Sequence, residues 1–487
     1  MKQTIINIIL CGVVTSTFFS CKKYLDEIPK DRIAESNYYN NLESAKGAIS
    51  AIYSPIRKNA LNGPYFLQMD IKADYGYGRG STAPIGEYRT LDQVNISRTD
   101  GMWADFYRSI SYANIAIERI PQISSIGEET SNQLIAEAKF MRAFCYYHLV
   151  INWGGVPLYL NNNSESMARA PVQEVYNAII TDLKEGENNL PSMPEQYGHP
   201  TKWAAKAFLA QVYLTIEQWD NAQKKAEEVI SSNMFSLIDV TQPDDFDNIF
   251  GAAANGTPEE IFYLKFNHLD GWQRPLNLLW TASQFAPFGN YVTFEKPDNP
   301  FIVEWDDNDL RKQFNLFTEY IHQTTGQITP LPASTPVLCS KFRDPGATGV
   351  TGFGNNFPFL RYADVLTIYA EANAMEENGP SPLAIECLNK VKRRGYGYPV
   401  DAVSPVDYPT TGWTEDTFRD AVIQERAYEH FMEGKRWEDL RRTQKAAAAI
   451  LHAKGIVVQE SAYLWPIPQQ EIDTNPAIVQ ADQNPGY

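Results

Sequence analysis

Two stretches of the 487-residue sequence combine aromatic rings with short polar side chains. Such a combination is what a sugar site needs, because flat rings cover the C–H faces of pyranoses and polar groups meet their hydroxyls. We therefore predict ligand contacts in both stretches; the alternative for the aromatic residues is packing within the loops. The predicted ligand-binding residues are Asp74, Tyr75, Tyr77, Arg79 and Asn95 in the first stretch, and Trp272, Arg274, Trp280, Asn290 and Tyr291 in the second; Tyr88, Asp270 and Trp305 belong to the same sets.

Three acids spaced four residues apart, Glu425, Glu429 and Glu433, lie on one face of a predicted helix. Together with His430 they resemble a metal cluster, but neighbouring helical residues point about 100° apart. No H-E-x-x-H motif is present either. We interpret the acids as part of an ion-pair network. Its predicted basic members are Arg426, Lys435 and Arg436, and two further pairs, Glu137 with Arg142 and Arg361 with Asp364, are predicted to fix helix packing.

Other catalytic and cofactor chemistries find no support in the sequence. The run Gly76–Gly80 lacks the lysine and the helix of a phosphate loop, and no G-x-S-x-G elbow occurs. Asp306, Asp307 and Asp309 could bind calcium, although a solvated acidic turn is the interpretation we prefer. No C-x-x-C pair occurs, and we predict that Cys145, Cys339 and Cys387 are buried small hydrophobes. We expect no cofactor, no metal and no enzymatic activity.

The first twenty residues have the composition of an export signal. A basic start is followed by an apolar stretch from Ile5 to Phe19, which is too short and too polar for a comfortable membrane span. It ends in Ser20-Cys21, the arrangement in which a bacterial lipoprotein signal is cut and the cysteine is acylated. We predict lipidation at Cys21; an ordinary secretory signal with a chance cysteine is the alternative.

The net charge of −17 and the pI near 4.9 argue against nucleic acid as a partner, because a polyanion would be repelled. Hydrophobic residues make up 44% of the chain, which is the balance of a globular protein with a core.

Helical periodicity dominates the rest of the chain. Small alanines at predicted crossings and very short links between helices suggest tetratricopeptide-like hairpins. We predict an all-α fold of stacked helical hairpins. Helices are expected at Asn41–Arg57, Trp103–Ile120, Leu134–Val150, Val172–Leu190, Lys202–Ile216, Trp219–Ile230, Tyr362–Met375, Leu383–Arg394 and Thr414–Arg442.

The two aromatic-rich stretches interrupt this periodicity. They span Gly63–Gly101 and Phe235–Phe357, and long loops inside a compact domain often carry binding sites. No linker separates independent domains. We predict a signal peptide at 1–20 and a single domain at 21–487, with a helical scaffold at about 38–233 and 358–445 and a loop-rich insertion at about 234–357.

Six short motifs follow one another along the chain. They are Cys21-Lys22-Lys23-Tyr24-Leu25-Asp26 with Pro29; Trp103, Tyr107, Asn114 and Ile117-Glu118; Ala136-Glu137-Ala138 with Phe140-Met141-Arg142-Ala143 and Trp153 to Leu158; Arg361-Tyr362-Ala363-Asp364 with Ala370-Glu371-Ala372; Glu425-Arg426, Glu429, Glu433 to Trp437 and Asp439-Leu440; and Pro466-Ile467-Pro468, Glu471, Asn475-Pro476 and Gln483 to Tyr487. This order of motifs resembles the SusD/RagB family of surface nutrient-binding lipoproteins.

The resemblance implies a helical receptor that is anchored in the outer membrane and exposed at the cell surface. Its expected partners are a glycan and a SusC-like TonB-dependent transporter, on which it sits as a lid. A peptide or glycopeptide ligand for the same architecture remains open, as do a transporter interface for the tryptophans and a purely structural lid. From a different class, a lipid-anchored glycoside hydrolase is a further alternative, which turnover of an oligosaccharide would reveal.

Overall fold

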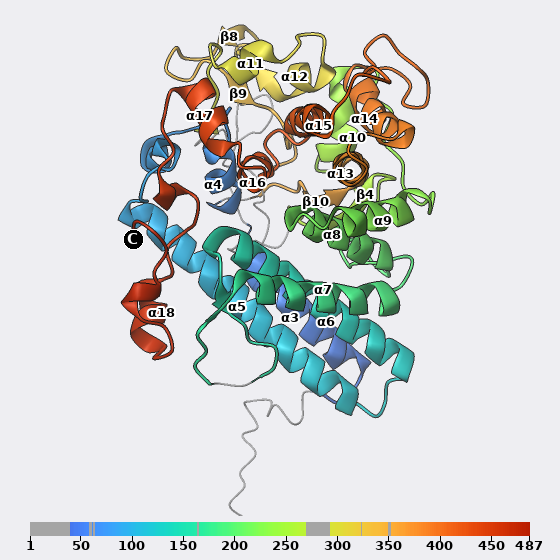
Figure 1. Ribbon diagram of the computed structural model, residues 1–487, viewed down its shortest axis with the longest axis vertical. Coiled ribbons are helices and arrows are strands. Elements are labelled where there is room, and N and C mark those ends of the chain that lie inside the picture. Colours follow the sequence, from blue (N-terminus) through green and yellow to red (C-terminus); the bar gives the residue numbers. More distant parts are fainter. Residues whose placement is uncertain are drawn as a thin grey trace, which may run out of the picture.

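A continuous stack of helices forms most of the computed structural model, which describes residues 39–57, 61, 64–162, 165–268, 293–322, 324–348 and 352–487 (Figure 1). Each helix of the stack packs on the next, as the hairpin prediction requires. In stacking order the helices are α3 (Leu42–Pro55), α5 (Gln93–Arg119), α6 (Glu128–Trp153), α7 (Val172–Asn189), α8 (Lys202–Thr215), α9 (Trp219–Ile230), α13 (Tyr362–Glu376), α14 (Pro382–Gly395) and α15 (Glu415–Glu429).

Helix α6 lies at the centre of the lower half of the stack, between α5 and α7. Between Ala136 and Trp153 nearly every side chain is buried, so this part of the helix has no solvent-exposed face. It ends at Gly154, whose φ of 76° is strained for residues with a side chain. The prediction that this segment is buried on most sides is confirmed.

Side-chain caps begin several of the stacked helices. Thr201 accepts the backbone N–H of Ala204 at the start of α8, and Ser381 accepts that of Ala384 at the start of α14. Such caps satisfy N–H groups that have no partner inside the helix. Gly186 lets α7 approach α8 closely, because a Cβ added there would lie 3.1 Å from the Cβ of Ala205.

Shorter elements cover the upper part and one side of the stack (Figure 1). Paired strands, each in a two-stranded antiparallel ladder, are β1 (Tyr77–Gly78) with β5 (Thr293–Phe294), β2 (Val156–Pro157) with β3 (Arg169–Ala170), β4 (Glu260–Leu264) with β10 (Phe357–Arg361), β6 (Leu316–Phe317) with β9 (Leu338–Cys339), and β7 (Glu319–Ile321) with β8 (Ile328–Pro330). The shorter helices are α4 (Pro64–Lys72), η3 (Gly80–Glu87), η4 (Ile120–Gln122), η5 (Pro243–Phe246), α10 (Asp247–Phe250), α11 (Pro300–Glu304), α12 (Leu310–Asn315), α16 (Arg436–Arg442), α17 (Ala446–Lys454), η6 (Glu460–Ala462), α18 (Gln469–Thr474) and η7 (Gln480–Asp482).

Three of the predicted helices have clearly different bounds. Helix α6 begins six residues before the predicted Leu134 and ends three residues after Val150. Helix α5 starts ten residues before Trp103, because Asp92 caps it and Gly101 is accommodated inside it with open space around its Cα. The segment Thr414–Arg442 forms α15 and α16 instead of one helix. The break passes through Met432 and Gly434, which have positive φ angles of 58° and 72°.

Within the described parts of the chain, no helix is both long and apolar enough to cross a membrane. The three cysteines Cys145, Cys339 and Cys387 are buried free thiols, as predicted.

Candidate functional site

A polar surface lies where β1, η3 and the first two turns of α5 meet β5. Its side chains are Tyr77, Arg79, Ser81, Arg98 and Lys296, all exposed or half-buried, and we call it the candidate face. The antiparallel pairing of Tyr77 with Phe294 holds its two parts together. The two aromatic-rich stretches of the sequence therefore meet at one place.

Tyr77 is the aromatic centre of the candidate face. Its ring stacks on that of Phe294, with 5.6 Å between the centroids and 28° between the planes. The ammonium groups of Lys296 and Lys454 lie 4.4 and 4.8 Å from the ring centroid, within cation–π range. Asn299 donates a hydrogen bond of 3.0 Å to the hydroxyl of Tyr77, so the ring is held in one orientation.

Asn95 and Arg98 connect η3 to α5 beside Tyr77. Asn95 is buried, and its amide donates to the backbone carbonyl of Ser81 at 3.0 Å and to the carboxylate of Asp92 at 2.8 Å. Arg98 donates to the hydroxyl of Ser81 at 2.9 Å and to the side-chain oxygen of Asn95. Asn95 thus positions Arg98 and Ser81, which are themselves accessible to a ligand.

Asp74 and Tyr75 are buried directly behind the candidate face. The carboxylate of Asp74 pairs with Arg436 at 2.6 Å. The hydroxyl of Tyr75 donates to Asp70 at 2.8 Å and accepts the backbone N–H of Met432 at 3.1 Å. In this conformation both residues support the loop before β1, and contact of either with a ligand stays a prediction.

Lys454 supports the same loop from α17. It donates to the hydroxyl of Tyr88 at 2.7 Å and to the carbonyls of Ile71 and Gly76. Burial lowers the pKa of Lys454 to about 7, so both the charged and the neutral form of its amine are populated near neutral pH. Sequence patterns did not single out Lys454, Lys296 or Arg98. The position of Arg98, three residues after Asn95, would have been a signal only if the helix predicted from Trp103 had been extended back to Gln93.

The remaining predicted ligand residues, Trp272, Arg274, Trp280, Asn290 and Tyr291, and the lipidation residue Cys21 lie outside the described residues. Tyr88 and Trp305, which belong to the same aromatic sets, are buried. The backbone of Tyr88 has a left-handed conformation with a φ of 51°, and the ring of Trp305 stacks on that of Tyr428. Among the acidic residues 306–309, Asp309 caps α12 and pairs with Arg311 at 2.7 Å. Asp309 is therefore part of the scaffold, not of a solvated turn.

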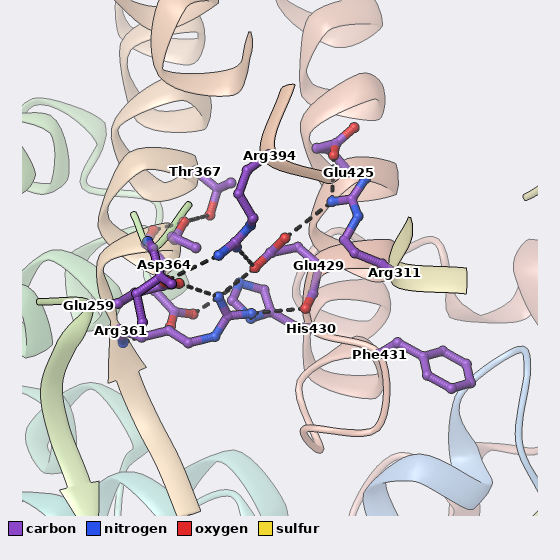
Figure 2. A network of polar contacts seen from close by, with 12 residues as sticks. Glu259, Arg311, Arg361, Asp364, Thr367, Arg394, Glu425, Glu429, His430 and Phe431 are labelled. Carbon is purple, nitrogen blue, oxygen red and sulfur yellow. Dashed lines mark hydrogen bonds and ion pairs between the residues drawn. The ribbon is translucent and has the colours of Figure 1, made fainter. Parts of the chain in front are cut away.

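Glu425 and Glu429 of α15, together with Glu433 just after it, belong to a buried ion-pair network, as predicted. Figure 2 shows the carboxylate of Glu429 between the guanidinium groups of Arg311, Arg361 and Arg394. These arginines also reach Glu259, Glu425 and Glu433. Although burial alone would raise the pKa of Glu429, the arginines hold it well below its usual range. Burial lowers the pKa of His430 to about 4, so this imidazole is neutral near pH 7.

The pairing within this network differs from the predicted one in several places. The side chain of Arg361 contacts Glu259, Glu429 and Glu433. Asp364 accepts from Arg361 only the hydrogen bond of the backbone N–H, and the carboxylate of Asp364 forms an ion pair with Lys435 at 2.7 Å. Arg426 and Arg436 pair with Asp439 and Asp74 instead of the α15 acids.

The predicted pair of Glu137 with Arg142 is also wrong. The two residues are five positions apart on α6, so their side chains point about 140° apart. Arg142 instead binds Asp182 through two hydrogen bonds of 2.8 Å. Glu137 accepts hydrogen bonds from Tyr53 at 2.6 Å and shares one with His199 at 2.7 Å.

Glu137 and His199 line a pocket of about 420 Å³ between α3, α6 and the chain before α8. No sequence pattern predicted it. At its rim Lys46 pairs with Glu195 at 2.7 Å, and the hydrogen bond with Glu137 raises the pKa of His199. The charged groups of this pocket therefore satisfy one another, whereas Arg98 and Lys296 of the candidate face border solvent.

Comparison with known proteins identifies the fold. Residues 199–487 match the model of the SusD family, and residues 81–214 match a model described as "Starch-binding associating with outer membrane". A SusD-like protein of Formosa agariphila is 25% identical over 99% of both chains.

Solved structures share the architecture. A "Laminarin binding SusD-like protein" superposes with a TM-score of 0.73 at 24% identity, covering 92% of this chain and all of the other. The surface glycan-binding protein A of Bacteroides fluxus superposes with a TM-score of 0.74 at 19% identity, again over 92% and 100% of the two chains.

Proposed function

The chain belongs to the SusD family, and from this premise we propose that it is an outer-membrane lipoprotein that binds a nutrient glycan. It holds the glycan at the cell surface and delivers it to a SusC-like TonB-dependent transporter. The anchor is an acylated Cys21, and each buried methylene of an acyl chain contributes about 0.8 kcal/mol to membrane binding. The description of the second family model, which mentions starch binding and the outer membrane, supports this proposal.

The observation that carries the proposal is the strand pairing that joins the two aromatic-rich stretches. Tyr77 offers a ring, while Arg79, Ser81, Arg98 and Lys296 offer hydroxyl and cationic donors. Such a mixture suits a polyol, which presents C–H faces to rings and hydroxyls to polar groups. We include Trp272, Arg274, Trp280, Asn290 and Tyr291 in the same ligand surface, since their stretch leads directly into β5.

The names of two structural neighbours agree with a glycan ligand, because one is a laminarin-binding protein and the other a surface glycan-binding protein. We propose binding without turnover. Glu425, Glu429 and Glu433 are held by arginines in the core, so these carboxylates could not reach a glycosidic bond.

The proposal is tested by calorimetry of the mature chain, beginning after Cys21, against a broad panel of oligosaccharides. Saturable binding without product formation is the expected result. A double variant, Trp272→Ala with Trp280→Ala, is expected to weaken binding about tenfold or more, because stacked aromatic faces contribute about 0.5–1.5 kcal/mol each beyond area burial. Tyr398→Ala, which removes an exposed ring in the loop after α14, serves as the matched control.

An unchanged affinity of the double variant would remove those tryptophans from the site. Release of shorter sugars would contradict the receptor assignment and favour a hydrolase, and binding of peptides with no sugar bound would replace the ligand class. Co-purification with the transporter from membranes tests delivery separately, and its absence would contradict the partnership.

A further inference from the structure

A second pocket, which shares no lining residue with the candidate face, lies between α5, the chain that follows β2, and α18. Its volume is about 360 Å³, within the range of small-ligand sites. Tyr107, Ser111 and Asn114 face it from α5, since positions three and four apart share one side of a helix. Tyr159 and Glu471 face it from the other two walls. We call it the α5–α18 pocket.

Buried hydrogen bonds hold the walls of this pocket in place. Arg142, which is 5% exposed, is fixed by Asp182 and donates to the side-chain oxygen of Asn114 and to the carbonyl of Leu160, both at 2.7 Å. The amide of Asn114 in turn donates to the carbonyls of Tyr159 and Asn161 at 3.1 and 3.0 Å. The pocket is therefore pre-organised, and a ligand would not have to order this part of the chain before binding.

Two aromatic rings form a corner in the pocket. The rings of Tyr107 and Tyr159 stand 81° apart with 6.0 Å between their centroids. The hydroxyl of Tyr107 donates a hydrogen bond of 2.8 Å to the carbonyl of Pro157, so a ligand would contact the ring of Tyr107 more than its hydroxyl. Tyr159 is half-buried, and part of its surface remains open to solvent.

The charge of the pocket excludes an anionic ligand. Its described lining includes two carboxylates, Glu165 and Glu471, and no lysine, arginine or histidine. One oxygen of Glu471 accepts from the amide of Asn475 at 2.8 Å, and a carboxylate has room for further donors such as hydroxyl groups. The exposed amides of Asn161 and Asn162 add donors and acceptors. The charge of this lining is negative, whereas the candidate face carries the cations Arg79, Arg98 and Lys296.

We propose that the α5–α18 pocket is a second, accessory site for neutral hexose chains. This inference rests on the proposed function, because it assumes that the protein meets glycans at all. The rings cover the C–H face of one pyranose, and Glu471 with the neighbouring amides binds its hydroxyls. A second contact on the same chain raises avidity for long polysaccharides without strengthening either site alone.

The test uses laminarihexaose and maltohexaose as probes at millimolar concentration. Hydrogen exchange of the mature protein is followed in peptides that cover residues 156–162 and 469–475, and calorimetry is repeated in the Trp272→Ala, Trp280→Ala background. At least one probe is expected to slow exchange in both segments. Tyr159→Ala is expected to remove this protection and to weaken the residual binding about tenfold, the loss of one aromatic contact.

Two further variants separate binding from folding. Glu471→Gln preserves the shape of the side chain and is expected to weaken binding severalfold with an unchanged melting temperature. Tyr112→Ala, which removes an exposed ring from another face of the same helix α5, is the matched control and leaves protection intact.

If neither probe slows exchange in these two segments, the accessory site is refuted. This holds even where the oligosaccharide panel shows glycan binding elsewhere on the protein. Protection by a lysine-rich peptide, with none by the probes, would overturn the ligand class instead. If the panel finds no glycan but the probes protect the α5–α18 pocket, the proposed function fails at the candidate face while this site stands.

Discussion

Replacing Glu429 with glutamine tests the buried network of Figure 2 directly. The carboxylate contacts Arg311, Arg361 and Arg394, which are between 0 and 2% exposed. Glutamine keeps the size of the side chain but leaves three buried cations with one fewer counter-charge. Removing one partner of a buried ion pair destabilises a protein by about 3–5 kcal/mol. We expect Glu429→Gln to lower the free energy of unfolding by this amount at pH 7.

The assay is urea unfolding of the mature chain, followed by circular dichroism. Asp220→Asn is the matched control, because it neutralises one acid of the exposed pair with Lys224, whose side chains are 48 and 63% exposed. An exposed pair of this type contributes less than about 0.5 kcal/mol. Equal losses in the two variants would refute the claim that burial gives the Glu429 contacts their strength.

The pH dependence of the same difference follows from the direction of the pKa shift. The pKa of Glu429 is depressed in the folded protein, so its contribution is fully present above the unfolded value of about 4.5. The stability difference between wild type and Glu429→Gln should therefore stay constant from pH 8 to pH 5 and shrink only in more acidic solution. A difference that shrinks between pH 8 and pH 6 would show that another group dominates.

Three further perturbations follow from the fold. Burial raises the pKa of Asp70 to about 7. The contribution of the protonated Asp70 to stability is therefore fully present below pH 4 and is lost as the pH rises through 7. In urea titrations, the free energy of unfolding of wild type relative to Asp70→Asn should fall by about 1 kcal/mol between pH 6 and pH 8. Gly434→Ala is expected to cost about 1–2 kcal/mol, because φ is 72° and the new Cβ would lie 3.0 Å from Phe66; a smaller change of the urea midpoint than for Gly455→Ala, where the space is open, would contradict this. Gly186→Leu is expected to lower stability by about 1–3 kcal/mol by forcing α7 away from α8, and an unchanged melting temperature would show that the crossing can relax.

The helical stack was largely predictable because its signals are local. Helix α9 coincides with the predicted Trp219–Ile230, where apolar residues recur at helical spacing and a short link precedes the first turn. The start of α5 was missed because Gly101 resembles a helix breaker in sequence, whereas the cap that starts the helix is Asp92, nine residues earlier. The break after α15 was missed because one of its positive φ angles falls at Met432, a residue type that carries no turn signal. The other falls at Gly434, a glycine that was considered only as part of a family motif.

The candidate face was less predictable because burial there depends on distant segments. Tyr75 and Tyr77 are two residues apart and alike in sequence, yet Tyr75 is covered by Phe301 and Phe431 while Tyr77 stays partly open. Asp74 has the composition of a ligand residue, but its partner Arg436 lies 362 positions further along the chain. Periodicity and spacing carry no information about such partners.

The pairing of β1 with β5 also has a consequence for the order in which the protein assembles. Tyr77 and Phe294 of the two strands are 217 positions apart in the sequence. Closing a loop of that size costs chain entropy before the contact between the strands can stabilise the fold. Helical hairpins such as α8 and α9 need only residues that are close in sequence, so they can form early in folding. The candidate face is therefore expected to form after the helical stack, and the pairing of Tyr77 with Phe294 would report on the completion of folding where helix content would not.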